Sequence, residues 1–167
     1  MKTVALTLQR YLALRLNLVI YLAGFLIPLI FTHPQVVTGT IVNALIFTVA
    51  DRLSKKALWP ILILPSLGAV SRGLLFGPQT FFLIYFLPFI WLGNYVQVTV
   101  FGLTKGQSYG LRIGGAAVAK YIVLVGIANI YFRLNIVPQL FVMSMGAIQL
   151  ITACLGGLVA KCLKSIA

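Results

Sequence analysis

This chain of 167 residues has almost no acidic side chains, because Asp51 is the only one against thirteen lysines and arginines. Proton-driven transport relies on acidic groups buried in the membrane, and acid–base catalysis needs a pair of carboxylates or histidines. The single histidine, His33, lies at the other end of an apolar run from Asp51. We therefore expect neither a self-powered proton transporter nor an enzyme, and we predict no catalytic residue.

Metal-binding and nucleotide-binding motifs are also missing. The two cysteines, Cys154 and Cys162, have only one histidine and one aspartate to join them, which is too few for an ordinary zinc or iron site. No Gly-x-x-x-x-Gly-Lys loop is present to hold nucleotide phosphates. We expect no metal and no cofactor, and we interpret both cysteines as packing residues.

Apolar residues dominate the chain, at 61% against 8% charged residues. A soluble domain needs a mostly polar surface, so lipid must be the solvent for most of this one. Apolar runs of about 20 residues are typical of membrane-spanning helices. The sequence predicts an all-α membrane protein, a single compact domain over residues 1–167 with six transmembrane helices at about 11–31, 35–50, 57–76, 80–101, 117–134 and 136–160.

The basic residues lie at the ends of the apolar runs and not on aromatic-rich amphipathic faces, so we expect no nucleic-acid partner. Six spans place both termini on one side of the bilayer. With a cytoplasmic N-terminus, eleven basic residues fall inside and only Arg72 and Arg133 fall outside. Lysine and arginine gather on the cytoplasmic side of membrane proteins. We expect a multi-pass protein of the cytoplasmic membrane with both termini in the cytoplasm.

Lys120 is difficult to place, because a helix beginning at Leu111 would carry it about 14 Å into the membrane. A buried ammonium without a partner would be costly there. We favour an interfacial segment at residues 111–116, a fifth span that starts near Ala117, and a Lys120 side chain that extends back to the cytoplasm. For Asp51 we expect a surface ion pair with Arg52 or Lys55.

Polar side chains interrupt the apolar spans, mainly in their outer halves. Arg72 costs about 2.5–3.5 kcal/mol at mid-membrane on insertion scales and has no acidic partner nearby, so it extends outward or, alternatively, meets an anion. A single polar residue is more often an interhelical hydrogen bond than a ligand contact, whereas several converging ones favour a site. The candidate substrate-binding residues are Asn43, Arg72, Gln79, Tyr85, Asn94, Asn129 and Gln149.

Prolines and small residues inside the spans bear on how the helices pack. Pro65 and Pro88 each remove a helical hydrogen bond, and kinks there could open a pocket between helices. Small residues four positions apart, such as Gly156 and Ala160, let helix backbones approach. We interpret these pairs as packing within the chain, with docking of a partner helix as the alternative.

Six short helices, cytoplasmic termini, no ATP-binding machinery and polar residues toward the outer face together resemble the substrate-binding S component of an energy-coupling factor (ECF) transporter. The stretch from Leu64 to Pro78 resembles the glycine- and proline-rich third helix and turn of some of these proteins, and Gln149 to Gly157 resembles their closing helix. The resemblance is architectural and covers nearly the whole chain. Binding residues in that family differ with substrate, so none is carried over.

The resemblance implies a prokaryotic uptake function. A vitamin-like nutrient is captured on the outer side, and the helical unit then topples, driven by a transmembrane coupling subunit and two cytoplasmic ATPases. Arg72 would favour an anionic or carbonyl-bearing ligand. The alternative is a non-transporting anchor or scaffold subunit of a larger membrane complex, such as a redox assembly, in which the polar residues only pack helices.

Overall fold

A computed structural model describes the backbone of residues 2–31, 34–52, 55–73 and 80–166, and the side chains of 15–31, 34–52, 57–73 and 82–165. These residues are helical apart from short connections, and they contain no strand. His33 and the candidate Gln79 lie outside them. The helices in chain order are α1 (Lys2–Ile30), α2 (Gln35–Ala50), α3 (Lys55–Arg72), α4 (Thr80–Leu103), α5 (Tyr109–Arg133), α6 (Gln139–Met145) and α7 (Ala147–Ile166).

The helices identify a membrane protein. Three described stretches are long and apolar enough to cross a bilayer: Phe82–Leu103, Tyr109–Arg133 and Gln139–Ser165. The apolar stretches of α1, α2 and α3 within the described side chains are shorter: Arg15–Ile30, Gln35–Ala50 and Ala57–Arg72. Large apolar side chains such as Leu18, Ile122 and Leu158 point away from the protein and need lipid to cover them. The all-helical membrane class is confirmed, while six crossings stay a prediction.

Helix α5 begins at Tyr109 and includes residues 111–116, so the helix starts well before Ala117, where we predicted that the fifth span begins. Ser108 caps the helix, and its hydroxyl accepts a hydrogen bond from the Leu111 amide at 3.4 Å. A serine cap satisfies one of the free amides at a helix start. The Gly114-Gly115 pair costs about 1 kcal/mol per residue in helix propensity, which tertiary packing overrides here.

The predicted sixth span, 136–160, corresponds to the apolar stretch Gln139–Ser165, but it is not one continuous helix, because Gly146 separates α6 from α7. The Gly146 amide still donates to the Val142 carbonyl at 2.9 Å, but its φ of −98° and ψ of −103° are not helical. A Cβ atom at this position would lie 2.7 Å from the Val142 oxygen. Glycine is therefore the residue that permits this break.

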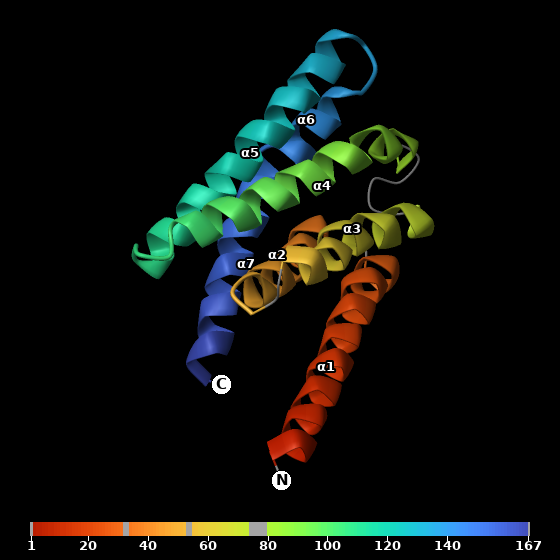
Figure 1. The fold of residues 1–167 in the computed structure, drawn as a ribbon. Helices are drawn as coiled ribbons and strands as arrows, with labels where there is room; N and C mark the ends of the chain where they lie inside the picture. Colours follow the sequence, from red (N-terminus) through yellow and green to blue (C-terminus); the bar gives the residue numbers. More distant parts are fainter. Residues whose placement is uncertain (1, 32–33, 53–54, 74–79, 167) are drawn as a thin grey trace.

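The helices pack mainly in pairs, α2 on α7, α1 on α3 and α4 on α5 (Figure 1). Helix α1 leads away from the rest toward the N-terminus, and both chain ends lie at the lower side of the view. The α2–α7 contact is the most extensive, and the backbones approach closely there: a Cβ on Gly156 would lie 2.6 Å from the Asn43 Cβ and 2.7 Å from the Thr40 oxygen. At Gly156 the expected packing within the chain is confirmed.

Asp51 ties the ends of three helices together. Its carboxylate accepts from the Arg112 guanidinium of α5 at 2.8 Å and pairs with Lys164 of α7 at 3.5 Å. Arg112 is buried, donates to the Phe101 carbonyl at 3.2 Å and lies 3.9 Å from the centre of the Phe101 ring. Asp51 is therefore in an ion pair, but its partners belong to distant helices; the neighbouring Arg52 is exposed, and the side chain of Lys55 lies outside the described residues.

We expect Asp51→Asn to lower the free energy of unfolding by about 2 kcal/mol, because hydrogen bonds to charged groups contribute roughly that much and Arg112 would stay buried. Unfolding of the purified protein in mixed detergent micelles measures the change. The matched control is Arg52→Gln, which removes an exposed charge next to Asp51 and should leave stability within about 0.5 kcal/mol. An equal loss of stability in both variants would mean that the contribution of Asp51 depends on its neighbour Arg52 and not on Arg112.

Candidate ligand-binding cavity

A polar cavity of about 80 Å³ lies where the helices meet, and every helix from α1 to α7 contributes at least one residue to its wall. Pro28 comes from α1, Pro65 from α3 and Met145 from α6. The polar members of the wall are Gln35, Thr38, Asn43, Ser66, Asn94, Lys120, Gln149 and Thr152. A cluster of polar side chains thus lies within an interior that is otherwise mainly apolar.

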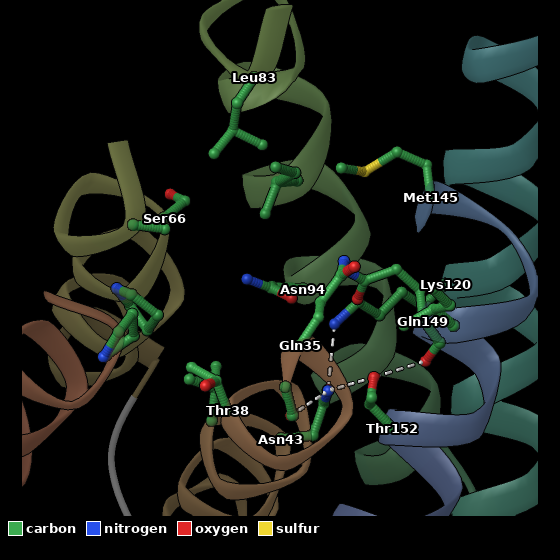
Figure 2. A pocket seen from close by; sticks show the side chains of 17 residues that line it. Gln35, Thr38, Asn43, Ser66, Leu83, Asn94, Lys120, Met145, Gln149 and Thr152 are labelled. Atoms are coloured by element: carbon green, nitrogen blue, oxygen red, sulfur yellow. Dashed lines mark hydrogen bonds between the residues drawn. The ribbon is translucent and has the colours of Figure 1, made fainter. Parts of the chain in front are cut away.

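Asn43 is the centre of the hydrogen bonds in this wall (Figure 2). Its side-chain oxygen accepts from Lys120 Nζ at 3.0 Å and from Gln97 Nε2 at 3.1 Å. Its side-chain nitrogen donates to the Gly39 carbonyl at 2.8 Å and to Thr152 Oγ1 at 3.3 Å. One amide therefore joins α2 to α4, α5 and α7.

Lys120 is buried with 3% of its surface exposed, so the expectation that it extends back to the cytoplasm is wrong. It follows Ile113 by seven residues and precedes Leu124 by four, which places all three on one face of α5. That face is buried against the other helices, and the small Ala116 lies on it too. The ammonium is directed to the Asn43 oxygen instead of the membrane surface.

The wall contributed by α3 surrounds Pro65. Asn94 of α4 donates to the Leu62 carbonyl at 2.9 Å, and Trp91 of α4 donates to the Ser66 hydroxyl at 2.8 Å. Two side chains of α4 thus bind α3 close to the proline, Asn94 through a backbone carbonyl and Trp91 through a side-chain hydroxyl. Pro65 lines the cavity, as expected for a proline that opens a pocket, whereas Pro88 is exposed.

Several buried polar atoms around this region have no hydrogen-bond partner in the described residues. Asn94 Oδ1 and Gln97 Oε1 are unused acceptors, and Gln35 Nε2 is an unused donor. Buried polar groups without partners are rare and costly in folded proteins. Asn94 and Gln35 both line the cavity, so a polar guest in it could satisfy them.

The break at Gly146 adjoins the cavity, since Met145 before it and Ile148 after it both belong to the wall. Transport proteins often form binding sites at interrupted membrane helices, because irregular backbone is tolerated where it lines a polar space. This wall is therefore formed by a helix with a local change of direction. The continuous helix expected from the sequence offers no such feature.

The structure brings together three of the seven residues predicted to bind substrate: Asn43, Asn94 and Gln149 line the cavity. Three others lie elsewhere. Arg72 is exposed at the end of α3, Tyr85 is 43% exposed, and Asn129 is exposed with its amide donating to the Val125 carbonyl. Gln79 falls outside the described residues. Ligand binding by this set stays a prediction.

The sequence analysis did not assign Lys120, Gln35 or Thr152 to the site. For Lys120 a signal was present, because the residues three, four and seven positions before it are Ala117, Ala116 and Ile113, a small and apolar face suited to packing against other helices. That spacing favours an inward-facing lysine. Gln35 and Thr152 carry no comparable local signal.

The polar part of the cavity wall consists of one amine and of uncharged groups. Among the cavity-lining residues Lys120 is the only ionisable side chain, and the rest of the polar wall consists of amides and hydroxyls. In the described part of the chain, no group of three histidine, cysteine or acidic residues could hold a metal ion. The chain matches no protein-family model, no curated protein and no solved structure.

Proposed function

We propose that this protein is the membrane-embedded substrate-binding subunit of an ATP-driven uptake transporter, similar in its role to the S component of an ECF transporter. The observation that carries the proposal is the central polar cavity with walls from all seven helices. In this proposal the chain crosses the cytoplasmic membrane six times with both termini inside. It takes up a small nutrient from the outer side.

Two features of the site support binding over simple helix packing. Polar residues that only hold helices together find their partners within the protein, whereas Asn94 Oδ1 and Gln35 Nε2 line the wall without one. The cavity also lies beside an interrupted helix, a common position for substrate sites in transporters. Energy for uptake comes from a coupling subunit and cytoplasmic ATPases, because the chain has no buried carboxylate for proton coupling.

The second candidate function is a non-transporting scaffold. The bonds from Asn43 to Thr152 and Lys120 favour it, because they join three helices without any ligand. In a scaffold the cavity holds only water. The two functions differ in whether a small molecule stabilises the folded protein.

Ligand-dependent thermal stability of the purified protein tests the proposal across a panel of vitamins and small metabolites. We expect at least one compound to stabilise the protein, by about 2.7 kcal/mol at a concentration of 100 Kd. The paired variants are Asn94→Leu in the cavity and Asn129→Leu on the exposed side of α5. Asn94→Leu should abolish the stabilisation, while Asn129→Leu and Arg72→Gln should keep it.

A panel without any stabilising compound would favour the scaffold. Stabilisation that disappears in Arg72→Gln but persists in Asn94→Leu would place the ligand outside the cavity. Transport itself is tested by co-purification with ATPase subunits and by ATP-dependent uptake of the stabilising compound into vesicles. Uptake without ATP would contradict the coupling to ATPases.

A further inference from the structure

Lys120 is a buried cation with incomplete hydrogen bonding. An ammonium has three N–H donors, and the structure shows one protein acceptor for it, Asn43 Oδ1 at 3.0 Å. The same oxygen is shared with Gln97 Nε2. A neutral amide oxygen that already accepts a second bond does not compensate a buried positive charge.

The chain has no acidic side chain left for Lys120. Asp51 is the only one in the sequence, and it pairs with Arg112 at 2.8 Å and with Lys164 at 3.5 Å. The groups that line the cavity together with Lys120 come from all the other helices, and they are amides, hydroxyls and apolar side chains. A negative charge that pairs with Lys120 would therefore have to come from outside the chain.

The cavity has the size and the polarity for a compact anion. A water molecule takes up about 30 Å³ in the liquid, so a space of about 80 Å³ takes roughly two to three waters or a small organic molecule. Gln35 Nε2 is a second donor without a partner, and Asn94 Oδ1 is a free acceptor in the same wall. Two donors and one acceptor suit a carboxylate that also carries a hydroxyl or an N–H group.

We infer that Lys120 is the counterion for a compact carboxylate bound in the central cavity, with Asn94 accepting a hydrogen bond from the rest of the ligand. The inference rests on the proposed binding function and names its substrate class. Arg72, exposed at the end of α3, takes no part in this recognition. A large vitamin does not fit unless the helices separate, whereas a small hydroxy or aromatic acid does.

The experiment compares carboxylates with their neutral amides in nanodiscs of phosphatidylcholine: glycolate with glycolamide, lactate with lactamide, and nicotinate with nicotinamide. We expect at least one carboxylate to bind roughly 30-fold more tightly than its amide, because a buried charge that loses its partner weakens binding by that factor or more. Lys120→Met should remove this preference, and Lys120→Arg should retain part of it. The control, Lys105→Met, changes an exposed lysine and should keep the full preference.

Several outcomes overturn the inference. Equal affinity for acid and amide, or an unchanged preference in Lys120→Met, leaves the cavity as a binding site without an anionic subsite. If inorganic phosphate binds the cavity in place of the carboxylate, the ligand is a phosphate. If the cavity is occupied only in discs that contain phosphatidylglycerol, the ligand is a lipid headgroup and not a free carboxylate. Carboxylate binding that depends on Lys120 in a protein that neither joins ATPases nor transports supports the inference and contradicts the uptake function.

Discussion

Asn43→Leu should lower the free energy of unfolding by about 3 kcal/mol or more. The substitution leaves the Lys120 ammonium buried without its protein acceptor, and burial of an unpaired charge is among the costliest changes in a folded protein. It also removes the acceptor for Gln97 and the donor to Thr152. Unfolding by sodium dodecyl sulfate in mixed micelles, followed by circular dichroism, measures the loss.

A double-mutant cycle separates the charge from the packing. Lys120→Met alone removes the buried charge, so Asn43→Leu combined with Lys120→Met should lose less stability than the sum of the two single variants. Asn129→Leu is the matched control, since its amide bonds only its own helix on an exposed face. Additive losses in the cycle would show that Asn43 does not act through Lys120.

Gly156→Leu should strongly disrupt the contact between α2 and α7. Its Cβ would lie 2.7 Å from both the Ala44 nitrogen and the Thr40 oxygen, which are backbone atoms that cannot turn aside. Overpacking typically costs about 1–3 kcal/mol, and we expect the upper end or beyond because α2 and α7 must separate. The folded fraction after detergent extraction, measured by size-exclusion chromatography, reports the effect.

Gly126→Leu is the matched control for this variant. Gly126 is exposed on α5, and a Cβ there meets no atom within 4 Å. The added leucine faces lipid, so the folded fraction should stay near that of the unchanged protein. Comparable loss in both variants would mean that the chain is sensitive to any larger residue in its helices, and the α2–α7 contact would lose its special importance.

Uninterrupted apolar runs in the sequence predicted the positions of the corresponding helices correctly. The second predicted span, 35–50, coincides with α2, and the fourth differs from α4 by two residues at one end. The predicted helix bounds differ from the structure where contacts between distant helices outweigh the local sequence pattern. Lys120 suggested a late start for α5, although its partner on α2 allows burial, and Gly146 interrupts a stretch whose hydropathy is continuous.

The sequence predicted which types of residue line the cavity, but it did not predict all of the individual residues. Asn43, Asn94 and Gln149 are polar residues inside apolar helices, and polar groups in such helices turn inward, which explains why the structure gathers them. Arg72 was the sharpest candidate because of its charge, but it lies at a helix end, where the side chain reaches the surface. Lys120 was missed because its acceptor lies 77 residues away in the sequence.

That separation also bears on how the protein is made. Helix α2 is synthesised before α5, so in the proposed topology Asn43 is already in the membrane when the translocon releases the segment with Lys120. A lysine at the centre of an inserting helix costs about 2.5–3.5 kcal/mol. The apolar residues of α5 must compensate this cost only until α5 packs against α2. The order of the helices along the chain thus places the acceptor in the bilayer ahead of the cation.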